Sequence, residues 1–304
     1  MHEAFLYDDL EEYLDGAAAF VREGVGRGEP VLVATDATKN RALAERLGRQ
    51  SDAVRFVDIR DVGRNPARII PVWERFVAER ADPAMPVRGI GEPIWAGRSA
   101  DELEEAHLHE LLLNVAFADT AGFRLLCPYH RGALEGRVLD GALCSYPYVG
   151  DRRGIDLSET YRAGEQARVF GGELPDAPDS VPIEFDRNTL PGARRRILET
   201  AGQLGAGADL SDALALVAGE LCANSCRHAA AGGGTVRLWR AGASIVIEVR
   251  DEGAIDDPLA GRRRPLPGAT RGYGLWLVNQ LCDLVQIRRS GRGTTVRAHL
   301  AAGA

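Results

Sequence analysis

The sequence predicts an α/β domain with a doubly wound parallel sheet, followed by a smaller α+β domain. Residues 1 to about 170 alternate between short apolar strands and amphipathic helices, which is typical of a parallel sheet covered on both faces. Residues 183–304 instead place two helices ahead of two pairs of strands. Gly171 to Ser180 is rich in Gly, Pro and Asp. We therefore predict domains at 1–170 and 183–304, joined by a linker at 171–182.

Composition indicates an ordinary water-soluble protein of about two domains. The 304 residues are 45% hydrophobic and 27% charged, and no apolar run approaches the roughly 20 residues that cross a bilayer. Met1-His2-Glu3 does not begin a signal peptide, so we expect a cytoplasmic location and no membrane partner. The five cysteines lack paired spacing, which favours reduced thiols.

Charge differs between the two parts. Residues 183–304 hold 16 Arg against 12 Asp plus Glu, which gives a net charge of +4. Since the whole chain has a net charge of −7, residues 1–182 have a net charge of −11. Neither part has the concentrated basic face of a nucleic-acid binder, so we expect no direct nucleic-acid partner.

The first domain is expected to alternate its elements throughout. The expected strands are Phe5–Tyr7, Pro30–Ala34, Val54–Asp58, Val87–Gly91 and Phe123–Cys127, and the expected helices are Leu10–Gly26, Thr38–Leu47, Ala67–Ala78 and Glu102–Phe117. A ligand site should then lie at the carboxyl ends of the strands. Thr35 to Asn40 contains no glycine, which argues against a Walker-type phosphate loop.

The second domain is expected to cover one face of a sheet with its helices. A helix at Tyr161–Val169 precedes the linker, and Val181–Phe185 should form an edge strand. The further expected elements are helices at Leu190–Leu204, around Glu220 and at about 274–283, and strands at about 234–240, 244–250, 284–289 and 293–300.

A polar stripe on the helix around Glu220 is the central candidate site. Val217 and Leu221 belong to its apolar face, and Glu220, Asn224 and His228 follow four residues apart on nearly the same stripe. An unpaired buried polar group costs about 1–3 kcal/mol, so these side chains need a partner such as a cation or ligand. The alternative is a rotated helix that exposes Glu220 and leaves His228 as a satisfied core histidine.

Two glycine-containing segments follow this helix. One strand ends in Asp251-Glu252-Gly253, where a carboxylate meets a residue that permits close backbone approach. Gly272-Tyr273-Gly274 leads directly into a helix, whose free amide groups favour phosphate. Each signal is common alone, but their order and spacing behind Glu220 and Asn224 are much harder to obtain by chance.

Together these motifs resemble the ATP-binding domain of the GHKL (HATPase) superfamily, in particular its anti-sigma factors that are serine protein kinases. The resemblance covers about residues 183–300 and implies a Bergerat-type ATP-binding sandwich. It implies that Asn224 ligates Mg²⁺, that Asp251 accepts a hydrogen bond from adenine and that Glu220 is the catalytic general base. The implied cofactor contacts are Asn224, Asp251, Gly253, Gly272, Gly274 and Thr294.

Two departures from the family pattern leave ATP binding open. Ile255 stands where a second glycine is expected, and the segment from Ala254 to Arg271 is a proline-rich lid that carries Arg262-Arg263-Arg264. We expect these arginines to form a solvated surface run, with a phosphate clamp or a site for an acidic partner as the alternative. The domain is therefore either a kinase that uses Mg·ATP or a binding module with a degenerate nucleotide site.

Distinctive residues also gather at the strand ends of the first domain. They are Gly91-Glu92-Pro93-Ile94-Trp95, then His109-Glu110 with Asn114, then Cys127-Pro128-Tyr129-His130. These motifs resemble the MEDS sensory domain, a RecA-like fold without the phosphate loop that occurs fused to GHKL anti-sigma domains in actinobacterial regulators. The resemblance covers residues 1 to about 150 and implies ligand sensing.

We assign Glu92, Trp95, His109 and Cys127 to the sensory pocket. Imidazole and thiolate suit soft or borderline ions, so the ligand is either a metal or a small electrophilic or hydrocarbon-like molecule. The alternative, which we favour over a metal, is a buried Cys127 acting as a small hydrophobe and a His109 with a local hydrogen bond. Cys127 as an enzyme nucleophile is less favoured because no base is evident beside it.

The sequence thus predicts a cytoplasmic regulator whose first domain senses a ligand and whose second domain binds a sigma factor. The family resemblance also implies phosphorylation of a serine on an anti-anti-sigma partner of the STAS type. The alternative is a non-catalytic protein-binding module. The sensed ligand, the sigma factor, homodimer formation and the sign of the coupling between domains are left open.

Overall fold

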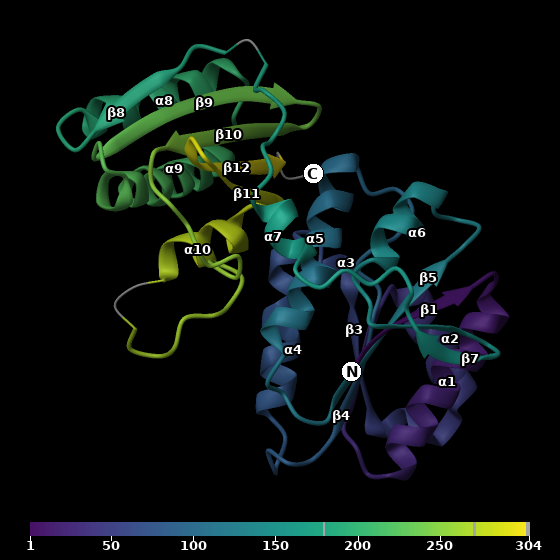
Figure 1. The fold of residues 1–304 in the computed structure, drawn as a ribbon. Coiled ribbons are helices and arrows are strands. Elements are labelled where there is room, and N and C mark those ends of the chain that lie inside the picture. Colours follow the sequence, from purple (N-terminus) through teal and green to yellow (C-terminus); the bar gives the residue numbers. More distant parts are fainter. Residues whose placement is uncertain (179, 270–271, 302–304) are drawn as a thin grey trace. The chain divides into compact units, whose positions relative to one another are not determined.

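A computed structural model describes residues 1–178, 180–269 and 272–301 (Figure 1). The chain forms two compact units, Met1–Glu165 and Gln166–Ala304. Residue 179 of the predicted linker and residues 270–271 of the predicted lid lie outside the described ranges. Within those ranges, no helix is both long and apolar enough to span a bilayer. All five cysteines are free thiols, as expected.

The first unit is built on one seven-stranded sheet with the order β3-β2-β4-β5-β1-β6-β7. Its strands are β1 (His2–Tyr7), β2 (Val31–Thr35), β3 (Val54–Asp58), β4 (Val87–Gly91), β5 (Phe123–His130), β6 (Tyr148–Asp151) and β7 (Gly154–Leu157). All neighbours are parallel except β6 and β7, so the sheet is mixed where the sequence predicted a parallel one. The β6–β7 hairpin was not predicted, because β7 is short and exposed along its whole length and so has no apolar periodicity.

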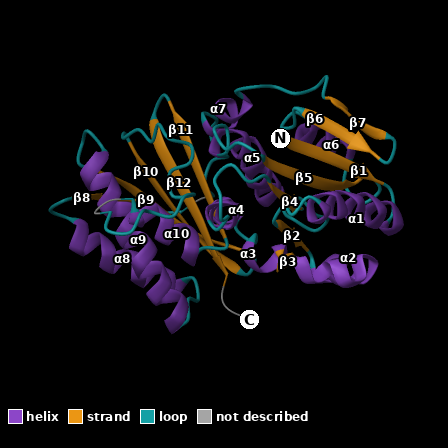
Figure 2. Ribbon diagram, turned by 90° about the horizontal axis from the view of Figure 1, so that it is seen from below, coloured by secondary structure: helices purple, strands orange, loops and turns teal. Residues whose placement is uncertain are grey.

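The helices of this unit lie on both faces of the sheet (Figure 2). They are α1 (Leu10–Gly26), α2 (Ala37–Leu47), α3 (Ile59–Val62), α4 (Ile69–Ala78), α5 (Ala100–Ala116) and α6 (Gly136–Leu143), with 3-10 turns at Gly48–Ala53 and Pro66–Arg68. Tyr13 and Val21 of α1 belong to a core on one face. Trp73 of α4 lies against Gly89 and Gly91 of β4 on the other face.

The second unit is an antiparallel sheet with its helices on one face, as predicted (Figure 2). After α7 (Glu165–Phe170), its elements are β8 (Ile183–Asp186), α8 (Leu190–Gln203), α9 (Ala208–His228), β9 (Gly233–Ala241), β10 (Ser244–Asp251), α10 (Tyr273–Leu281), β11 (Leu284–Ser290) and β12 (Gly293–Ala301). The strand order is β11-β12-β10-β9-β8, so β8 is an edge strand. Leu214, Val217 and Leu221 of α9 are buried in its core, which fixes the rotation of α9 on the sheet.

The fit of Trp73 on β4 can be tested at Gly89. A Cβ atom there would lie 2.7 Å from the Trp73 ring and 2.8 Å from Leu125. Gly89→Ala should therefore lower the free energy of unfolding of the first unit by about 1–3 kcal/mol, as measured by urea denaturation. Gly26→Ala is the matched control, because a Cβ at Gly26 meets nothing within 4 Å. Equal stability of the two variants would contradict tight packing at Gly89.

Candidate functional site

The polar stripe on α9 meets the first turn of α10. Glu220 and Asn224 are both half-buried and lie one turn apart on α9. A Cβ atom added to Gly274 would lie 2.8 Å from Glu220 Oε2 and 3.3 Å from Asn224 Nδ2. A side chain at this position would therefore have to displace the Glu220 carboxylate or the Asn224 amide. Gly272 lies directly before α10 and has a φ of +93°, which favours glycine. Both predicted glycines therefore lie at the start of α10.

Asp251 lies beside this stripe and is held by two hydrogen bonds. The Ser225 hydroxyl on α9 donates to Asp251 Oδ2, and the backbone amide of Gly253 donates to Oδ1 at 2.7 Å. Thr294 Oγ1 donates to the Gly253 carbonyl at 2.8 Å, so Thr294 supports the loop through its backbone. Ser225 was missed from the sequence, although it directly follows Asn224. A carboxylate has about four acceptor positions, so Asp251 retains capacity for a further donor.

The end of α9 differs from both sequence-based interpretations. His228 is exposed, so it is neither a ligand-facing residue of a buried stripe nor a satisfied core histidine. The exposed Arg227 donates to Asn224 Oδ1 at 3.1 Å, which is the oxygen that a hard cation would take. Exposed contacts of this kind contribute about 0–1 kcal/mol, so a divalent cation can replace the arginine at modest cost.

The lid segment folds partly onto α10. Asn279 Nδ2 donates to the Gly261 carbonyl at 3.0 Å, and Gly261 has a φ of +73°. Arg262 is only 2% exposed, so the expectation of a solvated arginine run is wrong there and holds only for Arg263 and Arg264. Ile255, at the position of the missing glycine, packs against the core of this unit.

The residues that meet at α9 and α10 fit Mg·ATP chemically. Amide and carboxylate oxygens of Asn224 and Glu220 are hard donors of the kind that Mg²⁺ prefers. The helix start at Gly274 offers amide groups to phosphate and carries no side chain that would block a close approach. The structure thus places Gly274 against Glu220 and Asn224, and it links Asp251, Gly253 and Thr294 in a second bonded group that reaches α9 at Ser225.

In the first unit, Glu92 is paired with a lysine. Lys39 Nζ lies 2.7 Å from Glu92 Oε2, and the Tyr7 hydroxyl donates to Oε1 at 3.1 Å. Glu92 is only 4% exposed, and burial raises its pKa in spite of the nearby ammonium group. Lys39 was not predicted as a site residue, although it is the only lysine in the chain.

Trp95 lines a separate cavity of about 400 Å³ at the carboxyl ends of β4 and β5. Residues lining it include Trp95, Arg98, Leu103, His107, Leu134 and Val138, and Glu92 is not among its lining residues. The Arg98 guanidinium lies 3.5 Å from the centre of the Trp95 ring and donates to the Gly63 and Pro93 carbonyls. Burial lowers the pKa of Arg98 to about 10. This volume is within the range of small-molecule pockets.

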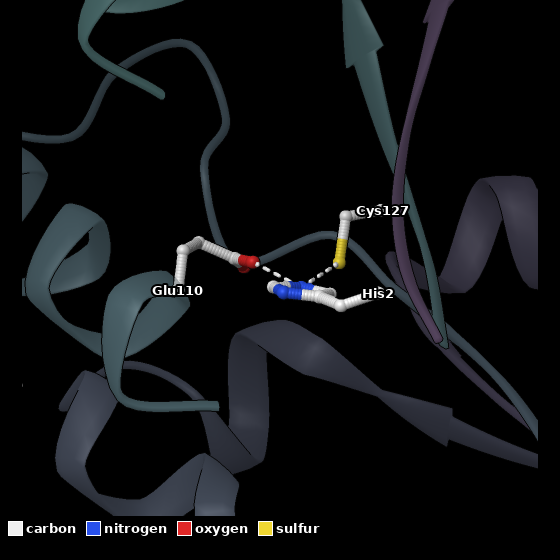
Figure 3. A group of neighbouring side chains, drawn as sticks. All are labelled: His2, Glu110 and Cys127. Carbon is white, nitrogen blue, oxygen red and sulfur yellow. Dashed lines mark hydrogen bonds and ion pairs between the residues drawn. The ribbon is translucent and has the colours of Figure 1, made fainter. Parts of the chain in front are cut away.

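Cys127 belongs to a third group, with His2 and Glu110 (Figure 3). His2 Nε2 lies 3.0 Å from Glu110 Oε2 and 3.5 Å from Cys127 Sγ. The predicted His109 is buried but is not part of this group, because adjacent residues on a helix point about 100° apart. A base therefore does lie beside Cys127. Burial nevertheless raises the pKa of the thiol, and at 1% exposure it cannot meet a bulky electrophile.

Comparisons with known families agree with both family resemblances noted in the sequence. Residues 1–147 match the family described as MEDS: MEthanogen/methylotroph, DcmR Sensory domain. Residues 183–300 match the family described as Histidine kinase-like ATPase domain. No curated protein matches the chain. A sensory domain is thus found in the N-terminal part and a GHKL-like ATPase domain in the C-terminal part, and such a domain implies ATP binding, usually with Mg²⁺.

The contribution of the Lys39–Glu92 pair to stability can be tested, because the Glu92 carboxylate is buried. Lys39→Met leaves the Glu92 carboxylate buried without its cation, so the free energy of unfolding should fall by about 3 kcal/mol. Lys39→Met/Glu92→Leu should recover most of this loss. The matched control is Arg55→Met, which removes an exposed pair with Glu79 and should cost less than about 1 kcal/mol. A Lys39→Met variant as stable as the control in urea denaturation would contradict this assignment.

Proposed function

We propose that this protein is a ligand-controlled anti-sigma regulator. Its MEDS domain, with a RecA-like fold, binds a small molecule, and its GHKL-like domain binds Mg·ATP and a sigma factor. The observation that carries the proposal is the close approach of Gly274 to Glu220 and Asn224, beside an Asp251 that is fixed by hydrogen bonds.

In this proposal, each site residue of the second unit has its own role in nucleotide binding. The Asn224 amide oxygen would hold Mg²⁺, and the amides at the start of α10 would bind phosphate. Asp251 would accept a hydrogen bond from the adenine amino group, with Ser225 and Gly253 keeping its carboxylate in place. When bound, Mg·ATP supplies a transferable phosphoryl group whose charge is neutralised by the metal.

Glu220 is the residue placed to serve as general base. Its carboxylate lies against the start of α10 and is half-exposed, so a serine hydroxyl of a partner protein can reach it. We propose that this partner is an anti-anti-sigma protein of the STAS type. Support for both protein partners comes from the resemblance to anti-sigma kinases.

The Trp95 cavity is the proposed sensory site of the first unit. Its wall combines apolar side chains with five charged or polar residues, which are Arg98, Glu104, His107, Glu135 and Arg137. This lining suits a small molecule that has an apolar part and a polar group. Its place at the carboxyl ends of β4 and β5 is where parallel sheets usually bind ligands.

The second candidate function is a non-catalytic binding module. It is favoured by Ile255, which packs into the core in place of a flexible glycine, and by the Arg227 contact to Asn224. In that case the second unit would act through protein contacts alone, and Mg·ATP would not change its affinity for a partner.

Calorimetric titration with ATP separates the two candidates. We expect wild-type protein to bind ATP only when Mg²⁺ is present, and Asn224→Ala to weaken that binding about tenfold or more, because a charged contact is lost. Asn188→Ala, at an exposed asparagine of the same unit, is the matched control and should bind like wild type. No binding heat from wild-type protein would leave only the non-catalytic candidate.

Catalysis is tested separately at Glu220. Glu220→Gln should keep nucleotide affinity but slow phosphoryl transfer to a STAS-type partner about 100-fold or more, since the proton acceptor is lost. Transfer from labelled ATP measures this rate. Glu199→Gln changes an exposed glutamate on α8 and should transfer at the wild-type rate. Transfer by Glu220→Gln at the control rate would rule out a base at this position.

A further inference from the structure

The His2, Glu110 and Cys127 group plays no part in the proposed ATP chemistry and lies apart from the residues that line the Trp95 cavity. Its members come from three elements that meet in the first unit: His2 from β1, Glu110 from α5 and Cys127 from β5 (Figure 3). In the parallel pairing of β1 with β5, Ala4 lies opposite Cys127, so His2 is close along the strand. All three side chains are buried, with exposures of 8%, 0% and 1%.

The spacing of the donor atoms is close to that around a metal ion. The imidazole nitrogen, a carboxylate oxygen and the sulfur all lie within 4.8 Å of one another. Around a tetrahedral zinc ion, bonds of about 2.0–2.1 Å to nitrogen or oxygen and about 2.3 Å to sulfur place donors roughly 3.3–3.6 Å apart. His2 Nε2 lies 3.0 Å from Glu110 Oε2 and 3.5 Å from Cys127 Sγ.

A neighbouring amide fixes the orientation of the His2 ring. Asn114 Nδ2 donates to the Ser145 carbonyl at 2.7 Å, which assigns Asn114 Oδ1 as an acceptor. Oδ1 lies 3.1 Å from His2 Nδ1, so this ring nitrogen carries the proton. The opposite nitrogen, Nε2, then faces Glu110 and Cys127. Metal-binding histidines are commonly held in this way by a hydrogen bond to the other nitrogen.

The Glu110 carboxylate also has an oxygen that lacks a partner. Glu110 Oε2 accepts from the Tyr146 hydroxyl, whereas Oε1 is buried with no hydrogen-bond partner among the described residues. An unpaired carboxylate oxygen is costly to bury in a site that excludes water. A divalent ion would compensate both the carboxylate and a coordinated thiolate, because a thiol that binds a metal loses its proton.

We propose that His2 Nε2, the Glu110 carboxylate and Cys127 Sγ bind one divalent ion of the zinc type. The mixed nitrogen, oxygen and sulfur donors suit this borderline ion better than Mg²⁺ or Ca²⁺. Three protein ligands leave a fourth position for water or a small ligand. His107, one turn before Glu110 on α5, lines the Trp95 cavity, so one helix contacts both the ion and that cavity.

The test uses the full chain purified without a histidine tag, loaded with Zn²⁺ and dialysed. We expect one retained zinc per chain by elemental analysis, and X-ray absorption should show one sulfur among lighter nitrogen and oxygen neighbours. Cys127→Ser should weaken zinc binding about 100-fold, and Asn114→Ala about 10–100-fold through its hold on His2. Cys144→Ser is the matched control at a half-buried cysteine of the same unit and should keep wild-type affinity.

Two results would overturn the site: wild-type protein that retains no zinc, or zinc without a sulfur neighbour. The first would leave the hydrogen bond between His2 and Glu110 as the account of the cluster. The absorption measurement needs only wild-type protein, so it decides the question even where a variant does not fold. Nucleotide titration of the same samples is independent, so failure of the zinc site and failure of the ATP proposal are distinguishable.

Discussion

The fixed carboxylate of Asp251 is the interaction on which the ATPase-like site depends. It joins Ser225 of α9 to the loop after β10, and Thr294 of β12 holds the same loop through the Gly253 carbonyl. Asp251 and Thr294 are also direct partners in the β10–β12 pairing. Since the apolar face of α9 is buried on the same sheet, the turn that carries Glu220 and Asn224 has one orientation. That orientation faces the start of α10, where glycine permits contact.

In the first unit, several buried polar groups lower the free energy of unfolding. Lys39 with Glu92, and His2 with Glu110, are ion pairs or hydrogen-bonded pairs with almost no exposure of the carboxylates. Hydrophobic residues at these positions would stabilise the sheet as well or better, because burying charge costs several kcal/mol per ion, on the order of 3–5. Buried ionisable clusters of this kind are therefore candidates for function rather than for stability. Sensing by this unit is consistent with that distribution.

Periodicity predicted most of the fold, and the family motifs predicted where the ATPase-like site lies. The helix Leu10–Gly26 and the strand Val87–Gly91 have the predicted bounds because their apolar pattern and caps are local. The His2 contact with Cys127 joins residues 125 positions apart, which no local pattern encodes, so His109 was chosen in its place. The burial of Arg262 was missed for a related reason, because the lid that carries it is bonded to Asn279, which lies 18 residues from Gly261 in the sequence. The features that the sequence did not predict thus depend on contacts between residues far apart in the chain.

Hydrogen–deuterium exchange of the full chain with and without Mg·ADP tests the central claim most directly. If the site where α9 meets α10 binds nucleotide, the amides of residues 220–228, 251–255 and 272–277 should exchange more slowly together when Mg·ADP is present. Residues of the MEDS domain around the Trp95 cavity serve as the internal reference. Unchanged exchange in those three segments at saturating Mg·ADP would contradict the account and leave the GHKL-like unit as a surface for protein contacts only.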